Sequence, residues 1–208
     1  MEILQNVDGK QTSNGARDII DETAPYIARV MVQGTAPLLF HGWNNESIAE
    51  KGKSAKGSKA KKTDDIESYV YRNDAGLLGI PGKNFYASVV EAGRYVQDPR
   101  SPRKSARDLC RAGIVPLTVI APFTPQTKEW DYLDKQRVTV QRNGITRVRP
   151  AMREGWKVTF DLLINLPEYI PEHLLTKLLN DAGRLVGVCD YRPTYGRFLV
   201  NGFQIVEA

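Results

Sequence analysis

Cations and aromatic rings beside glycines are the residues of this sequence best suited to chemistry. Lys83 and Asn84 follow an Ile-Pro-Gly turn, while Arg192, Tyr195 and Arg197 lie in a glycine-punctuated segment near the end of the chain. Cations neutralise phosphates, and flat rings stack on unpaired bases. Glycines let a backbone approach a phosphate closely, although they can also simply make turns. This combination predicts a surface that binds RNA or single-stranded DNA.

Lys83 has an unusual position for a lysine. Phe85, Val89, Ala92 and Val96 share one helical face, which predicts a helix from Lys83 to Val96. A cation in the first turn opposes the helix dipole, so this position makes sense if a phosphate binds beside it. The alternative is a lysine that is merely solvated.

A lysine-rich tract carries the excess positive charge. The stretch from Lys51 to Lys62 contributes six lysines and no acid, which exceeds the net charge of +5 for the whole chain. The charge is therefore concentrated in patches, as on a surface that binds nucleic acid or an acidic partner. Because the tract has no hydrophobic anchor, its simplest interpretation is a solvated loop that an anion could order.

Arginines also mark a hairpin predicted around Asn143-Gly144. The residues predicted to contact nucleic acid are Trp43, Lys51, Lys53, Lys56, Lys59, Lys61, Lys62, Lys83, Asn84, Arg137, Arg142, Arg147, Arg149, Arg192, Tyr195 and Arg197, with Tyr191 as a further stacking candidate. Each has a structural alternative. Trp43 could pack on the core edge, Tyr195 could hold its loop to the sheet, and arginines could pair with acids such as Asp161 and Asp190.

Catalysis is not expected from the residue types present. The chain has two histidines, of which His173 begins a predicted helix and should lie on the surface. His41 and Glu46 are the candidates for a catalytic role, but a lone histidine is more often structural. Classical nucleophile and phosphate-loop motifs are absent. Cys110 and Cys189 form no C-x-x-C pair and have no histidine at ligand spacing, so no metal, cofactor or disulfide is predicted.

The elements that must position these residues follow from hydrophobic patterning. Residues 1–25 are polar and should form an arm, and a first strand begins at Tyr26 and continues past Gly34 and Pro37 to Phe40. A second apolar run, 77–80, stops at the Pro-Gly turn and leads into the helix. The later elements are a basic loop at 100–111, strands at 114–120 and 156–166, a helix from 171 to 182 and a last strand at 198–206.

Without its insertions the predicted order is β-α-β-β-α-β. This is the ferredoxin-like, RRM-like plan of the α+β class, which builds an antiparallel sheet with both helices on one face. One domain at 26–208 is expected, with a lysine-rich insertion at about 43–67 and a hairpin insertion at about 123–153. No apolar run suits a signal peptide or a membrane span, which predicts a cytoplasmic protein without a membrane partner.

Three segments in this order resemble the RAMP superfamily, and within it the guide-RNA-binding backbone subunits of CRISPR interference complexes. Residues 34–42 are similar to the family's opening strand and glycine turn. Residues 65–74 with 80–85 resemble its short paired strands, Ile-Pro-Gly turn and first helix. Residues 187–197, which contain Tyr-Gly-Arg, are similar to its C-terminal glycine-rich signature.

The resemblance implies a subunit that binds a strand without cutting it. In the members that cut target RNA an aspartate follows the glycine turn, where this chain reads Gly42-Trp43-Asn44-Asn45-Glu46. Asparagine cannot act as that carboxylate. In the family, an extension in place of the lysine-rich tract acts as a thumb that reaches over the guide. The implied partners are guide RNA, further copies in a head-to-tail, helical or filamentous assembly, and other CRISPR effector subunits.

Three alternatives remain open. The chain could be a stand-alone viral or mobile-element relative that coats single strands, which would place it in an infected host cell instead of a prokaryote. It could be a RAMP endoribonuclease that uses His41 or Glu46. It could also be a structural protein whose basic loop contacts a protein partner.

Overall fold

The computed structural model describes residues 24–42, 66–140 and 143–206, with the backbone alone for 138–140 and 143–145. The chain forms an α+β fold, the class that the sequence predicts. Its central sheet has four antiparallel strands in the order β11-β1-β10-β6. These strands are β1 (Tyr26–Gly34), β6 (Ile114–Pro116), β10 (Lys157–Ile164) and β11 (Phe198–Val206).

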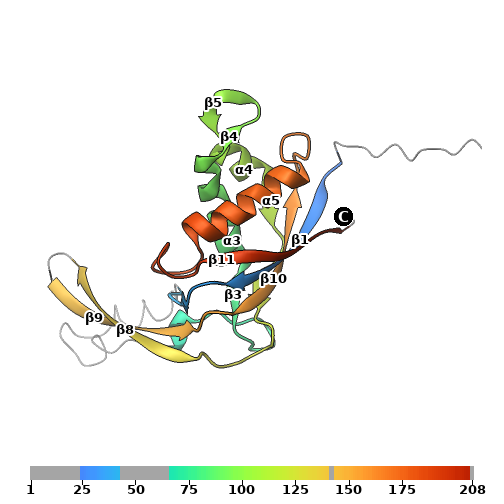
Figure 1. Cartoon of the computed structure of the whole chain (residues 1–208). Helices are drawn as coiled ribbons and strands as arrows, with labels where there is room; N and C mark the ends of the chain where they lie inside the picture. Colours follow the sequence, from blue (N-terminus) through green and yellow to red (C-terminus); the bar gives the residue numbers. More distant parts are fainter. Residues whose placement is uncertain (1–23, 43–65, 141–142, 207–208) are drawn as a thin grey trace, which may run out of the picture.

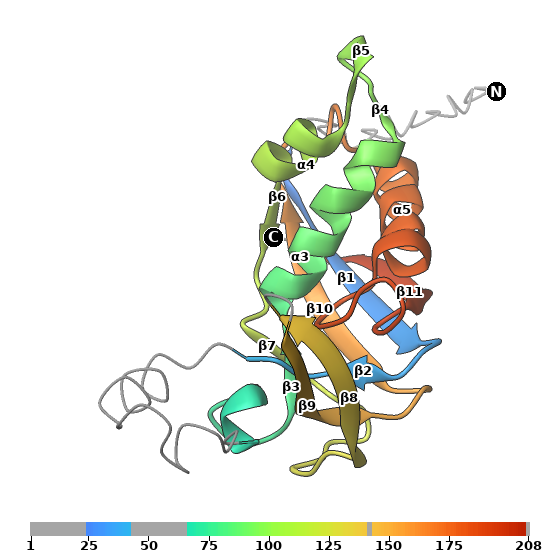
Figure 2. The same cartoon turned by 90° about the vertical axis from the view of Figure 1, so that its left-hand side faces the viewer.

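Two helices cover one face of this sheet. They are α3 (Gly82–Ala92) and α5 (Glu172–Asp181), which lie side by side in Figures 1 and 2. In the sequence α3 lies between β1 and β6, and α5 lies between β10 and β11. Each helix therefore lies in a connection between two strands of the central sheet, and both helices pack on the same hydrophobic core.

Side chains alternate between buried and exposed along the strands of the central sheet. In β1 the side chains of Ala28, Val30 and Val32 are buried, while Arg29 and Met31 between them are exposed. The same alternation runs along β10. Three phenylalanine rings pack together in the largely aliphatic core between the sheet and the helices. Phe85 of α3 stacks on Phe160 of β10 with centroids 4.0 Å apart, and the edge of Phe198 packs against Phe85 at 5.8 Å.

Smaller sheets surround this core. The hairpin of β8 (Tyr132–Val140) and β9 (Asn143–Met152) joins β2 (Leu38–Leu39) in the order β2-β9-β8 and projects away from the helices in Figure 1. The strand β3 (Gly79–Pro81) pairs with β7 (Ile120–Pro122), and β4 (Gln97–Asp98) pairs with β5 (Ser101–Ser105). The helix α4 (Arg107–Gly113) packs beside α3.

Five local predictions need correction. The predicted loop at 100–111 contains β5 and the start of α4, because Ala106, Leu109, Cys110 and Gly113 bury one face at helical spacing. The predicted helix 83–96 is α-helical only as far as Ala92, and the chain continues as the 3-10 turn η2 (Gly93–Tyr95).

The other three corrections concern strands and turns. The expected paired strands at 65–74 are a 3-10 turn, η1 (Glu67–Tyr69), and one bridge between Arg72 and Leu78. The predicted strand 114–120 is divided between β6 and β7, which pair with different neighbours. In the β8-β9 hairpin the backbone of Asn143 pairs with that of Val140 and the backbone of Gly144 with that of Thr139, so Asn143-Gly144 belongs to β9 and does not form the turn.

No helix in the described part of the chain is long and apolar enough to cross a membrane. The predicted arm lies outside the described residues except for its last two positions, and so does nearly all of the lysine-rich insertion.

Candidate nucleic-acid interface

Residues 187–197, here called the glycine loop, connect the π-helical end of α5, η3 (Ala182–Val186), to β11. The loop closes on itself, because the amide of Val188 donates to the carbonyl of Gly196 at 2.9 Å. It is also tied to the segment around β2, since the amide of Asp190 donates to Leu39 and that of Gly196 to Pro37. The sequence predicted a loop here, and the structure makes it a well-anchored one.

The glycine loop requires unusual backbone angles. Gly187 and Gly196 have φ values of 76° and 71°, and even Cys189 and Tyr191 have positive φ, at 62° and 55°. Non-glycine residues adopt this region rarely, and they do so where surrounding contacts hold them in place. The contacts of Asp190, which lies between the two non-glycine residues, therefore bear directly on the shape of the loop.

Asp190 joins the loop to the hairpin through a buried cation. Arg149 of β9 is only 6% exposed, and its Nε lies 2.5 Å from Asp190 Oδ2. The guanidinium of Arg149 also lies over the ring of Tyr191, 4.9 Å from its centroid. His41 approaches the same carboxylate, with 3.5 Å between Nδ1 and Oδ2. Arg149 is thus held inside the fold, as the acid-pairing alternative anticipated.

Two further side-chain contacts fix the loop. Tyr195 accepts a hydrogen bond from Nε2 of Gln136 in β8 at 2.7 Å. At the start of α3, Nδ2 of Asn84 donates to Sγ of Cys189 at 3.5 Å. Burial raises the pKa of the Cys189 thiol to about 12, so at neutral pH the thiol is protonated and is no nucleophile. Tyr195 and Asn84 therefore have structural contacts in addition to any role in binding.

The two ends of the lysine-rich insertion meet beside this loop. The amide of Gly42 donates to the carbonyl of Tyr69 at 2.7 Å, and the rings of His41 and Tyr69 lie 5.1 Å apart. A small cavity of about 120 Å³ is lined by His41, Tyr71, Asn84, Cys189 and Asp190. Any strand that crosses the glycine loop would consequently pass close to the point where the insertion leaves the fold.

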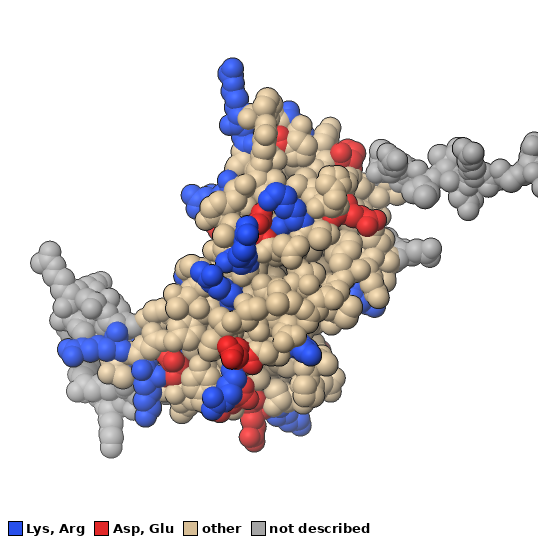
Figure 3. Space-filling view, in the orientation of Figure 1, with Lys and Arg blue, Asp and Glu red and all other residues tan. Residues whose placement is uncertain are grey.

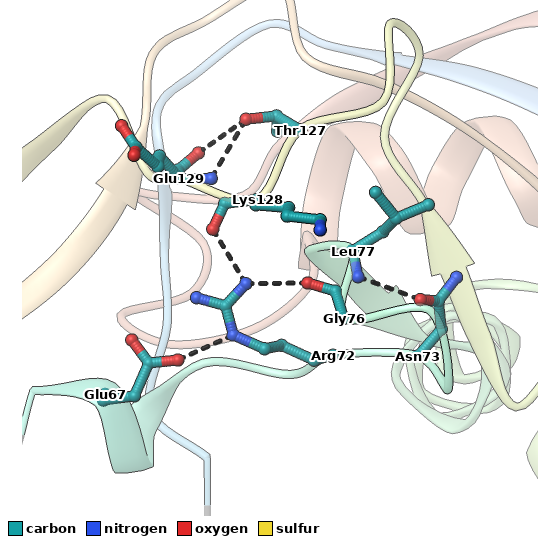
Figure 4. Close-up of polar contacts among 8 residues, drawn as sticks. All are labelled: Glu67, Arg72, Asn73, Gly76, Leu77, Thr127, Lys128 and Glu129. Carbon is teal, nitrogen blue, oxygen red and sulfur yellow. Dashed lines mark hydrogen bonds and ion pairs between the residues drawn. The ribbon is translucent and has the colours of Figure 1, made fainter.

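Arg72 fixes the segment that follows the insertion (Figure 4). Its Nε donates to Glu67 Oε1 at 2.6 Å, and its Nη1 donates to the carbonyls of Gly76 and Lys128 at 2.9 and 2.7 Å. One guanidinium thereby connects η1, the turn before β3 and the loop before β8. Its role is structural, because it holds together three segments that are separate in the sequence.

A hollow beside the glycine loop has a volume of about 790 Å³ and opens between α3, α4 and the loop. We call it the arginine–tyrosine pocket. Its defining lining residues are Tyr86, Tyr95, Arg107, Arg111, Tyr191 and Arg192, with Glu91 in its wall. The sequence prediction included Arg192 and Tyr191 but not the others.

Glu91 organises the charges of this pocket. A hydrogen bond from Arg94 lowers the pKa of Glu91 below its usual value, and the charges of Arg107 and Arg192 lower it further. Arg107 Nη2 lies 3.2 Å from Glu91 Oε2. Arg192 forms no hydrogen bond or ion pair with any described residue. Glu91 therefore stays ionised and attracts arginines, and Arg192 is left able to bind an anion.

A second hollow, of about 490 Å³, lies between α5 and β11 at the end of the loop. Lys177 and Arg184 line it and donate to the buried carboxylate of Asp181, and Arg197 lines it while donating to the carbonyl of Pro193. Figure 3 shows Lys and Arg side chains in a diagonal row across this face. Arg192 and Arg197, close in sequence, thus border different hollows.

The remaining predicted residues are distributed as follows. Lys83 and Arg137 are exposed, and Arg147 is half-buried, so all three can reach solvent. His173 is exposed at the start of α5, as expected. Predicted residues outside the described part of the chain are Trp43, Glu46, Lys51, Lys53, Lys56, Lys59, Lys61, Lys62 and Arg142. Among the described residues, no cluster of His, Cys, Asp and Glu could hold a metal ion.

Sequence reasoning missed the α4 side of the arginine–tyrosine pocket. Arg107 and Arg111 are four residues apart and share a face of α4, a spacing that would have been visible had the segment been recognised as a helix. Tyr86 is fixed by donating from its hydroxyl to the carbonyl of Arg111 at 3.1 Å. Tyr95, 63% exposed, carried no signal beyond its aromatic ring.

The sequence matches no protein-family model, and no curated protein matches it. Among solved structures, the fold is similar to a chain in the cryo-EM structure of the type III-B Cmr-beta complex bound to cognate target RNA. The TM-score is 0.51 at 9% identity, over 88% of this chain and 61% of that chain. The crystal structure of Cmr6 from Pyrococcus furiosus gives a TM-score of 0.46 at 11% identity, over 88% of this chain and 100% of that one.

This chain therefore covers less than two thirds of the length of the Cmr-beta chain that it matches. At such low identity the similarity concerns the fold. It confirms, at the level of the fold, the resemblance that three short segments of the sequence indicated.

Proposed function

We propose that this protein is a RAMP-type subunit that binds single-stranded nucleic acid without cutting it, with a CRISPR guide RNA as the strand. Its core follows the ferredoxin-like plan, and the lysine-rich and hairpin insertions extend a single domain. Copies assemble head-to-tail along the strand, because heterologous contacts repeat without closing. The observation that carries the proposal is the pair of cationic hollows that both border the glycine loop.

The chemistry of that surface suits a strand more than a duplex. Arg192 and Lys83 are exposed cations, and neither forms a hydrogen bond or an ion pair with a described residue. Such cations bind phosphates, which carry no sequence information, so the binding would tolerate many sequences. The rings of Tyr191 and Tyr195, both in the glycine loop, have centroids 6.2 Å apart and are offered to unpaired bases.

An endoribonuclease is the second candidate, because His41 lies beside Asp190. A carboxylate in that position orients an imidazole and favours its use as a general base. Replacing His41 with alanine separates the two functions. Loss of RNA cleavage with retained binding would support the nuclease, whereas a wild-type protein that leaves RNA intact would support the binder.

Nucleic acid that accompanies the purified full-length protein tests the proposal. We expect an absorbance ratio typical of a nucleoprotein, and sequencing should return RNA of one uniform length if the strand is a guide. Heterogeneous strands would instead indicate a stand-alone binder. A protein that purifies free of nucleic acid and does not shift labelled single strands at low salt would contradict both forms of the proposal.

A further inference from the structure

The arginine–tyrosine pocket has the volume of a ligand site. Its volume of about 790 Å³ falls within the roughly 300 to 1,000 Å³ usual for pockets that take small molecules. Its walls come from α3, α4 and the glycine loop, which are separate in sequence and are held together by packing and by the bond from Tyr86 to Arg111. The cavity is therefore part of the folded domain.

Its charges favour an anion. Arg107, Arg111 and Arg192 line the cavity, and the wall carboxylate of Glu91 is already engaged by Arg94 and Arg107. The Nε of Arg107 is buried without a hydrogen-bond partner among the described residues. Arg111 pairs with Asp108 at 3.3 Å, but both side chains are more than half exposed, so the pair contributes little stability. Arg111 can therefore leave Asp108 and bind a phosphate.

Its aromatic rings favour a base. Tyr95 is 63% exposed although it is large and apolar over most of its surface, and it forms no hydrogen bond with a described residue. Tyr86 and Tyr191 are both half-buried, and both line the cavity. A planar heterocycle between such rings removes apolar area from water, and guanidinium groups next to it bind the attached phosphate.

We propose that the arginine–tyrosine pocket binds one nucleotide, with its phosphate on the guanidinium groups of Arg107, Arg111 and Arg192 and its base against Tyr95. This inference rests on the proposed function, because the nucleotide is one unit of the strand that crosses the glycine loop. Arg192 belongs to both the loop and the pocket, so a strand held at the loop can turn one nucleotide into the cavity. Stacking without base-edge contacts predicts a preference for purines, whose ring faces are larger.

Titration of the full-length protein with nucleoside monophosphates tests the pocket separately from strand binding. Isothermal calorimetry should detect binding of AMP and GMP, with weaker binding of CMP and UMP and the weakest of inorganic phosphate. Tyr95→Ala should weaken AMP binding by about fivefold or more, the loss of one stacked ring. Arg111→Gln should weaken the binding of AMP but not that of adenosine.

Matched controls lie outside the pocket. Tyr169→Ala removes another exposed tyrosine, and Arg103→Gln removes an exposed arginine of β5, and both should leave AMP binding unchanged. Thermal unfolding by circular dichroism establishes that each variant is folded. The inference is overturned if AMP does not bind, if AMP binds no better than phosphate, or if Tyr95→Ala and Arg111→Gln behave like the controls.

Fluorescence anisotropy with a labelled single strand distinguishes this failure from failure of the proposed function. If the wild-type protein binds the strand while AMP fails to bind, the pocket assignment is wrong and the strand-binding proposal stands. If neither ligand binds, both are wrong. Strand binding that weakens in Tyr95→Ala and Arg111→Gln, but not in the two controls, supports both.

Discussion

Replacing Asp190 with alanine is expected to lower the free energy of unfolding by about 3 kcal/mol, because it leaves the buried guanidinium of Arg149 without its counter-charge. Arg149 has a side chain only 7% exposed, so water cannot replace the lost carboxylate. Asp190 itself is 26% exposed, which places the effect at the lower end of what breaking a buried pair costs. Urea denaturation followed by circular dichroism measures the change.

The same substitution should also weaken strand binding. Asp190 lies between Cys189 and Tyr191, whose positive φ angles depend on the contacts of the loop, and Arg192 follows two residues later. Once the loop relaxes, Arg192 loses its fixed position. Anisotropy with a labelled strand at constant salt should therefore report a higher dissociation constant even where the variant is fully folded.

An exposed ion pair provides the control for Asp190. Asp161 on β10 forms a bidentate pair with Arg29, whose side chain is 47% exposed. Because exposed pairs contribute little, Asp161→Ala should cost no more than about 1 kcal/mol. The double variant Asp190→Ala with Arg149→Met should recover part of the lost stability, since it removes the stranded charge. Equal losses in Asp190→Ala and Asp161→Ala would contradict the buried-pair account.

Replacing Gly196 with alanine is the second change with a large expected effect. A Cβ at this position would lie 1.9 Å from the carbonyl oxygen of Val188, and this oxygen belongs to the backbone on the other side of the glycine loop. The φ of 71° adds a strain that alanine tolerates poorly. We expect a loss of about 3 kcal/mol in unfolding free energy, at the upper end for backbone strain, together with reduced strand binding.

Gly76 isolates the contribution of that close approach. Its φ is 73°, nearly the same as at Gly196, but a Cβ there would meet no atom within 4 Å. Gly76→Ala should therefore cost only the conformational strain, about 1 kcal/mol. If both substitutions lowered the midpoint of thermal unfolding equally, the tight closure of the glycine loop would be refuted.

The strands and helices that hold the core could be predicted because their patterns are strong and local. The alternation in β10 and the apolar stripe of α5 each repeat over more than two periods. The helix α4 was missed because five basic residues between 100 and 111 suggested a solvated loop and hid the apolar face of Leu109 and Cys110. The hairpin turn was misplaced because pairing along the whole of β8 and β9, and not the Asn-Gly dipeptide, decides the register.

The candidate site could be predicted only in part, because its hollows are made by tertiary contacts. The sequence placed Arg192, Arg197 and Tyr195 in one glycine-rich loop, and the structure agrees. It could not indicate that Arg192 faces α4 while Arg197 faces α5, since that depends on where the two helices pack. Nor could it decide which arginine is buried. Arg149 and Arg147 are two residues apart in the same strand, yet only Arg149 meets Asp190.

The salt dependence of single-strand binding tests the central claim most directly. The experiment uses the full-length protein and a labelled RNA strand. We predict that the logarithm of the binding constant falls linearly with the logarithm of the salt concentration between about 50 and about 200 mM, because binding releases the cations that are condensed on the phosphates. Arg192→Gln should reduce the slope by about one and Arg103→Gln should leave it unchanged. The matching duplex should bind more weakly than the strand. Absence of strand binding at about 50 mM salt, or equal binding of strand and duplex, would contradict the account.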